Sequence, residues 1–134
     1  MTYLWLALAL PVAWFVQNCV HESSHLLFGW LEEGRKPLEF KPWPHMYEGR
    51  FHFARCLMGE ATKEGGSCMR HAAPILVNIP YTLLMLALTL LHFVFAVFVL
   101  CAWVDSLFWV YGYFWGSEFS DGKRFRKAMM EDNK

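Results

Sequence analysis

The distribution of charged residues constrains this chain more than any other feature of its sequence. From Thr2 to Leu31 the only charged residue is Glu22, and from Ala72 to Gly116 the only one is Asp105. A chain of 134 residues that is 56% hydrophobic and only 18% charged is too short to bury two such runs in the core of a soluble domain. We therefore exclude an ordinary soluble domain and predict an integral membrane protein in contact with the lipid bilayer.

The lengths of the two runs predict three membrane spans. The first run is about one span long, whereas the second, of 45 residues, would form a helix roughly 67 Å long, about twice the thickness of a bilayer core. The second run must therefore turn back, either near His92, which we favour, or near Asp105 and Ser106. We predict a single membrane-embedded domain over residues 1–134, with spans at about 3–31, 73–92 and 95–116, a first loop at 32–71 and a tail at 117–134.

The basic residues predict the orientation of these spans. All twelve Lys and Arg lie in the first loop or the tail, seven in the former and five in the latter. With three spans these regions share one side of the membrane, which the positive-inside rule makes the cytoplasm, with the N-terminus outside. The N-terminus lacks the basic region and cleavage site of a signal peptide, so we keep it in the mature protein and expect a bacterial cytoplasmic membrane. Twelve acidic residues balance the basic ones, so no nucleic-acid partner is expected.

The first loop contains the pattern of a β-hairpin. Residues 39–43 and 50–55 alternate polar and apolar side chains, and the turn-rich stretch at 44–49 separates them. The predicted fold is therefore an all-α membrane protein of about three transmembrane helices, with a membrane-associated β-hairpin in the first loop. The hairpin either offers a strand edge to an extended peptide or only plugs the helix bundle, and both alternatives stay open. The four cysteines lack a clear metal-binding spacing, and in a cytoplasmic setting we expect them to be reduced.

The first apolar run contains a candidate metal-binding motif, His21-Glu22-Ser23-Ser24-His25. Histidines at positions i and i+4 share one face of a helix, so both imidazoles can reach one metal ion. Glu22 lies about 100° around the helix from His21 and can hold a water molecule on the metal. A carboxylate in an apolar span is costly, which favours a function for Glu22. The alternative is a buried polar network that joins helices, made of Gln17, Asn18, His21, Glu22 and Ser24.

A catalytic zinc site usually has three protein ligands and a water molecule, so a third ligand is needed. Asp121 follows the third span on the side where His21 and His25 are expected, so its depth matches theirs. Asp105 should lie nearer the middle or the outer end of the third span, where it can instead be an interhelical hydrogen-bond partner. We favour Asp121 and keep Asp105 open. The remaining candidates, both expected in loops or turns, are His71 and His92.

These motifs resemble those of the site-2 protease family of intramembrane zinc metalloproteases. That family carries H-E-x-x-H in one membrane helix and an Asp-Gly motif in a later one, which residues 21–25 and 120–122 resemble. The run Ala72-Ala73-Pro74-Ile75-Leu76-Val77-Asn78 is similar to the family's A-G-P-x-x-N, with Ala73 in place of Gly and one additional residue before Asn78. The N-x-x-P run that usually precedes Asp-Gly is absent, and the hairpin resembles the family's membrane-inserted β-loop.

The resemblance implies a zinc endopeptidase that hydrolyses a peptide bond in or near a transmembrane segment of a membrane-protein substrate. His21, His25 and Asp121 would hold Zn²⁺, Glu22 would act as the general base, and Asn78 would help to stabilise the oxyanion. The main alternative is a catalytically silent relative that serves as a subunit or scaffold of a membrane complex, although the intact Glu22 argues against it. A haem protein would need histidines on two spans, where only His92 is available, and a His-box desaturase would need more than six histidines.

Overall fold

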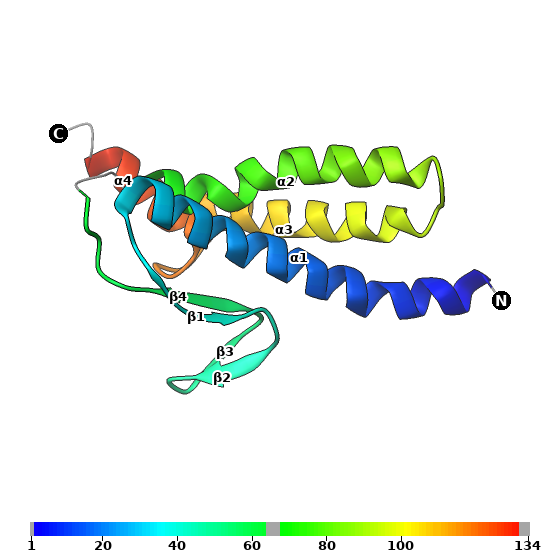
Figure 1. Cartoon of the computed structure of the whole chain (residues 1–134), viewed down its shortest axis with the longest axis horizontal. Helices are drawn as coiled ribbons and strands as arrows, with labels where there is room; N and C mark the ends of the chain where they lie inside the picture. Colours follow the sequence, from blue (N-terminus) through cyan, green and yellow to red (C-terminus); the bar gives the residue numbers. More distant parts are fainter. Residues whose placement is uncertain (1, 64–67, 132–134) are drawn as a thin grey trace.

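A computed structural model of the chain describes residues 2–63 and 68–131. In this part of the chain three long helices form the body of the molecule, and a short fourth helix follows at the C-terminal end (Figure 1). Residues 64–67 of the expected first loop and 132–134 of the tail lie outside the described residues. The helices are α1 (Thr2–Glu33), α2 (Cys68–Thr89), α3 (Phe95–Trp115) and α4 (Asp121–Glu131).

The three long helices are each apolar enough to cross a membrane, in agreement with the three predicted spans. The turn between α2 and α3 lies at residues 90–94, around His92, the earlier of its two expected positions. The second span was expected to begin near residue 73, but α2 already begins at Cys68, so Arg70 and His71 are helical rather than part of the loop. The charge of Arg70 is tolerated there because its Nε lies 2.8 Å from an oxygen of the buried Glu33, at the end of α1.

The described part of the bundle has apolar side chains outside and small or polar ones inside. Leu83, Leu107 and Phe108 are among the large apolar side chains that are more than half exposed. Small interior residues let helices approach closely, and polar ones can join them by hydrogen bonds, as in membrane bundles. This arrangement suits an outer surface in contact with lipid. The buried residues include Ala13, Ala73 and Ala102 as well as Gln17, Asn18, Glu22, His25, His71 and Asn78.

The hairpin region, residues 37–58, contains two antiparallel ladders instead of the single one expected. Strand β1 (Pro37–Lys41) pairs with β4 (Arg55–Met58), and β2 (His45–Tyr47) pairs with β3 (Arg50–His52). The expected pairing of 39–43 with 50–55 is therefore wrong in detail. Glu48 and Gly49 both have positive φ and form a tight two-residue turn, which places Tyr47 opposite Arg50. The prolines at 42 and 44 lack the N–H that a continuous ladder would need, so the pairing is interrupted there.

A buried asparagine of α1 holds the hairpin region at this interruption. The side-chain amide of Asn18 donates to the carbonyl oxygens of Pro42, at 3.2 Å, and Phe53, at 3.4 Å. The ring of Trp14, one turn earlier on α1, meets the ring of Phe53 edge-on, with 6.0 Å between centroids. The hairpin region is thereby attached to α1 next to the turn that contains Glu22.

Helix α4 was not expected, because the sequence after residue 116 was assigned only to a tail. Its first turn packs directly on the backbone of α3, where a Cβ on Gly122 would lie 2.3 Å from the oxygen of Trp109 and 2.4 Å from the nitrogen of Tyr113. The ring of Phe125 then packs on Trp109, with centroids 5.4 Å apart. This close approach turns the chain back against the bundle and brings Asp121, the first residue of α4, beside α1 and α2.

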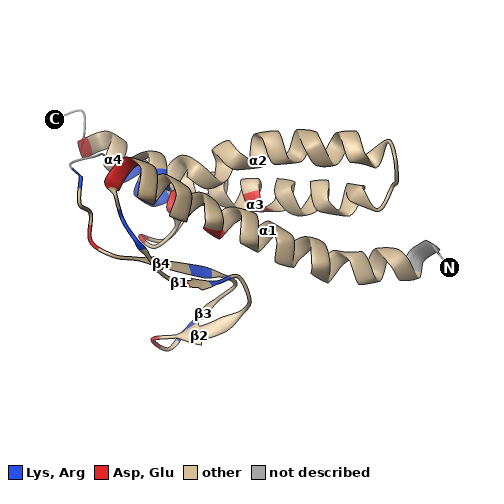
Figure 2. Ribbon diagram, in the orientation of Figure 1, with Lys and Arg blue, Asp and Glu red and all other residues tan. Residues whose placement is uncertain are grey.

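The described charges are gathered toward one end of the molecule. Figure 2 shows the Lys and Arg residues on α4, on the hairpin region, just after the end of α1 and at the beginning of α2, whereas the turn between α2 and α3 has none. The two basic regions of the sequence therefore lie at the same end of the three-helix bundle.

Candidate metal centre

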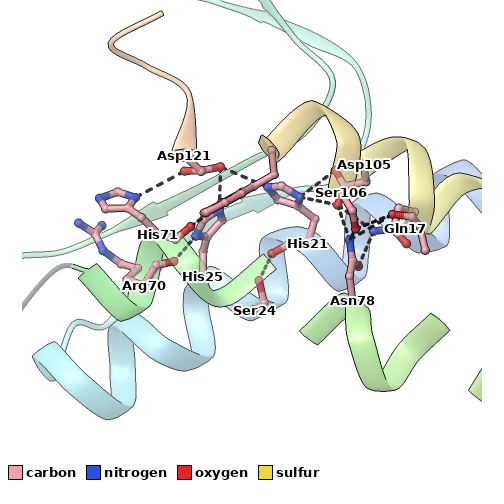
Figure 3. A network of polar contacts seen from close by, with 12 residues as sticks. Gln17, His21, Ser24, His25, Arg70, His71, Asn78, Asp105, Ser106 and Asp121 are labelled. Carbon is pink, nitrogen blue, oxygen red and sulfur yellow. Dashed lines mark hydrogen bonds and ion pairs between the residues drawn. The ribbon is translucent and has the colours of Figure 1, made fainter. Parts of the chain in front are cut away.

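The two histidines of the H-E-x-x-H motif lie side by side on α1 and face Asp121. Their ring centroids are 5.1 Å apart, and Asp121 Oδ2 lies 3.4 Å from His21 Nε2 and 3.1 Å from His25 Nε2 (Figure 3). One ligand atom of each residue lies within 4.8 Å of those of the other two. The three side chains expected from the sequence to bind metal therefore form a cluster that could hold an ion.

The other nitrogen of each imidazole already has a partner. His21 Nδ1 lies 3.0 Å from both carboxylate oxygens of Asp105, and His25 Nδ1 lies 2.9 Å from the backbone oxygen of Arg70. An ionised carboxylate and a carbonyl can only accept, so the ring proton is on Nδ1 in both histidines. Each Nε2 faces Asp121, to which it donates when it carries a proton, and its lone pair would be available to a metal ion bound between them. Metal-binding histidines in proteins are usually held in this way, so the donor set and its surroundings fit a metal ion.

The carbonyl that holds His25 is available because of a proline. In a helix, the oxygen of Arg70 would normally accept a hydrogen bond from the N–H of residue 74. Pro74 has no N–H, so this oxygen is left for His25 Nδ1. Pro74 is fully buried inside α2. Its missing N–H removes one backbone hydrogen bond without ending the helix. Pro74, in the A-A-P run, therefore supports the site indirectly, because it leaves the Arg70 oxygen free to accept from His25 Nδ1.

Asp121 contacts a third histidine with its other oxygen. Oδ1 lies 3.5 Å from Nδ1 of the buried His71, which is placed by the first turns of α2. Burial raises the pKa of Asp121, but the nearby His25 and the hydrogen bonds from His21, His25 and His71 outweigh it and hold that pKa well below its usual range. Asp121 is thus a carboxylate, the form that a metal requires. His71, a candidate ligand from the sequence, lies beside Asp121 Oδ1, outside the three-residue cluster.

Asn78 and Asp105 lie on the far side of His21 from Asp121 (Figure 3). The side-chain amide of Asn78 donates to Asp105 Oδ2 at 2.9 Å and accepts from Gln17 at 2.8 Å. Asp105, one of the four candidates for third ligand, is therefore the interhelical hydrogen-bond partner that the sequence allowed. His92, the remaining candidate, lies in the turn between α2 and α3, where Nδ1 accepts from the backbone N–H of Val94 at 3.2 Å.

A cavity of about 880 Å³ lies between the helices and the hairpin region. Its wall includes the buried Glu22 together with His25, His71 and Asp121 on the helices, and β4 on the opposite side. Cys56 of β4 lies near Glu22. Burial, followed by the charge of Glu22 and a hydrogen bond to it, raises the pKa of the Cys56 thiol above its usual value. None of the four cysteines, all of them in the described residues, forms a disulfide.

Helix α4 and the position of Cys56 beside the site were not expected from the sequence. The spacing of Phe125, Ala128 and Met129 is a helical signal for α4 that was available in the sequence. No comparable signal marks Cys56 as a neighbour of Glu22. Comparison of the chain with protein-family models, with curated proteins and with solved structures finds no match.

Proposed function

We propose that this protein is an intramembrane zinc metalloprotease that hydrolyses a peptide bond in or near a transmembrane segment of another membrane protein. The observation that supports this most strongly is the cluster of His21, His25 and Asp121, of which His25 and Asp121 line a cavity together with Glu22. Two imidazole nitrogens and one carboxylate oxygen are a typical donor set for catalytic zinc, which keeps its fourth position for water or substrate.

The proposed chemistry combines a metal with a general base. Bound zinc would supply a Lewis acid that lowers the pKa of water and polarises a carbonyl group. Glu22 would accept the proton of the attacking water and pass it to the leaving amine. Its position next to His21 in the sequence and its place in the cavity wall with His25 and Asp121 support this role. Asn78 does not line the cavity, and its role at the oxyanion stays a prediction.

The hairpin region supports binding of an extended peptide. Only one edge of β4 is paired, with β1, and all four residues of β4 (Arg55–Met58) line the cavity. A peptide that adds to a strand edge forms main-chain hydrogen bonds and so must be extended. A transmembrane substrate would have to unwind locally to expose its carbonyl groups, and β4 can hold the unwound segment. The substrate would be a membrane protein within the same bilayer.

The proposed orientation has the N-terminus outside and the basic end of the bundle in the cytoplasm of a bacterial cell. It rests on the gathering of basic residues at one end of the three apolar helices (Figure 2). The metal cluster would then be reached from the cytoplasmic side.

A second candidate is a catalytically silent subunit of a membrane complex. It is favoured by the hydrogen bonds that Gln17, Asn78 and Asp105 form between α1, α2 and α3, which can serve stability alone. The two functions differ in whether the chain binds zinc and cleaves a substrate.

The test is zinc content and cleavage of single-span substrates in proteoliposomes. The wild type should bind zinc and His25→Ala should not. Glu22→Gln keeps the shape of the side chain but cannot accept a proton, so it should keep zinc while turnover falls by about two to four orders of magnitude. Glu32→Gln, an exposed position on the same helix, is the matched control and should keep full activity. Full cleavage by Glu22→Gln would contradict the general base, and a wild type without zinc would contradict the metal centre.

A further inference from the structure

We propose that Asp105 is a positioning residue of the metal centre. It would hold His21 in the tautomer and orientation that direct Nε2 to the metal, without binding the metal itself. This inference rests on the proposed zinc site and adds the residue that preorganises it. It also separates Asp105 from Asp121, the two acidic residues between which the sequence could not decide.

The contact between Asp105 and His21 is specific to one ring nitrogen. Both carboxylate oxygens of Asp105 lie 3.0 Å from His21 Nδ1. The cluster with His25 and Asp121 is on the Nε2 side of the same ring. A carboxylate that occupies Nδ1 fixes the proton on that nitrogen, leaves the Nε2 lone pair for a metal and increases its basicity. Asp105 cannot replace Asp121 from this position, because the imidazole ring stands between it and the cluster (Figure 3).

Asp105 is in turn held by two buried amides from two other helices. Gln17 Nε2 of α1 and Asn78 Nδ2 of α2 each donate to its Oδ2 at 2.9 Å. Gln17 Nε2 also donates to Asn78 Oδ1 at 2.8 Å, which sets the orientation of both amides. Gln17 is 1% exposed and Asn78 is 2% exposed, so water has little access to this network. Three N–H groups thus converge on one carboxylate, an arrangement that suits its ionised form.

The location of Asp105 is a second reason to give it this role. It is the only charged residue between Ala72 and Gly116, and a carboxylate within an apolar span is costly unless it has a partner or a function. Asn and Gln side chains alone could join the three helices without that cost. A charge is needed only if the carboxylate must act on a neighbour, and His21 is the ionisable neighbour that it contacts.

The experiment compares Asp105→Leu and Asp105→Asn with the wild type, each as the full chain in detergent. Zinc affinity is measured by competition with a chromophoric chelator, the visible spectrum of the Co²⁺ form reports ligand geometry, and nitrogen NMR of the zinc-bound protein reports the hydrogen bond donated by Nδ1–H of His21. Asp121→Ala is the reference for loss of a ligand. Ser106→Ala is the matched control, because Ser106 is the next residue on α3 and accepts from Asn78 at 3.2 Å but does not contact His21.

We expect Asp105→Leu to bind zinc about 10- to 100-fold more weakly, with one ion still bound at saturation. The Co²⁺ spectrum should change, and the Nδ1–H signal of His21 in the zinc-bound variant should lose the shift that a hydrogen bond to a carboxylate produces. Asp105→Asn keeps the size of the side chain and one acceptor, so it should change all three measurements in the same direction but by less. It replaces Asp105→Leu in the comparison if that variant does not fold. Ser106→Ala should match the wild type.

Three results would overturn the inference. Unchanged zinc affinity and an unchanged Co²⁺ spectrum in both Asp105 variants would make Asp105 a structural residue only, while the zinc site stands. Complete loss of zinc in Asp105→Leu, equal to that in Asp121→Ala, would make Asp105 a ligand. A wild type that binds no zinc would overturn the metal centre and, with it, the role of Asp105, so the two proposals fail in different measurements.

Discussion

Each residue of the candidate metal cluster has a second contact that limits its rotation. His21 meets Asp105, His25 meets the carbonyl of Arg70, and Asp121 meets His71. A binding site is effective when its side chains need little rearrangement, and such outer contacts supply that order. These second contacts also explain why polar residues without a role in metal binding are present in the interior of an apolar bundle.

The thiol of Cys56 offers a measurement of the environment of Glu22. Burial, and after it the charge of Glu22, raises the thiol pKa, and only the thiolate reacts rapidly with iodoacetamide. In metal-free protein with the other three cysteines replaced by Ala, alkylation should therefore be slow at neutral pH and should accelerate only under alkaline conditions. Glu22→Gln removes one cause of the raised thiol pKa, so in this variant the alkylation of Cys56 should accelerate at a lower pH than in the wild type.

The control for this measurement is Glu32→Gln, which leaves the charge next to Cys56 in place and should not move the profile. Identical profiles for Glu22→Gln and the wild type would mean that Glu22 does not face Cys56 across the cavity.

Among the helices, α2 depends on a proline for its contribution to the site. In Pro74→Ala, the new backbone N–H can donate to the Arg70 oxygen and would compete with His25 Nδ1 for it. We expect α2 to become more regular while zinc affinity falls by about tenfold, measured by chelator competition.

Pro80→Ala is the matched control, since Pro80 is in the same helix but on its exposed side. It should leave zinc affinity unchanged. Equal affinities for Pro74→Ala and Pro80→Ala would contradict the role assigned to the Arg70 carbonyl.

The position of α4 depends on a glycine. A Cβ at residue 122 would lie 2.3 Å from the oxygen of Trp109, a backbone atom that cannot move aside without bending α3. Gly122→Ala should therefore displace α4 and move Asp121 from the histidines. We expect helicity to be nearly retained and zinc to be lost or strongly weakened, measured by circular dichroism and metal analysis.

Gly59→Ala serves as its control, because a Cβ there would make its nearest contact at an ordinary 3.6 Å, with the oxygen of Lys36. Normal zinc binding in Gly122→Ala would show that Asp121 does not depend on the close approach of α4 to α3.

For the whole molecule, the gathering of basic residues at one end predicts a common side for the hairpin region and the C-terminus (Figure 2). Reporter domains inserted after Thr62 and fused to the C-terminus should both report the cytoplasm. A reporter fused to the N-terminus is the control and should report the opposite side. Opposite compartments for the first two would mean that one of the three apolar helices does not cross the membrane.

The sequence by itself determined the features that depend on neighbours along the chain. Two runs with one charged residue each predicted three long apolar helices, and the i, i+4 spacing put His21 and His25 on one face. Asp121 was favoured over Asp105 by its expected depth and by the resemblance of residues 120–122 to an Asp-Gly motif. These inferences succeed because hydrophobicity and helical periodicity are local properties.

Only the tertiary structure decided which side chains meet across elements. The close packing of Gly122 on α3 brings Asp121 to the histidines, and the placement of α3 puts Asp105 on the opposite nitrogen of His21. The pairing of the hairpin strands depended on where prolines interrupt the ladder and where positive φ allows a tight turn. Such contacts arise from the packing of segments that are far apart in the sequence. Periodicity along a single helix or strand does not predict this packing. The same is true of the partner that each histidine nitrogen finds.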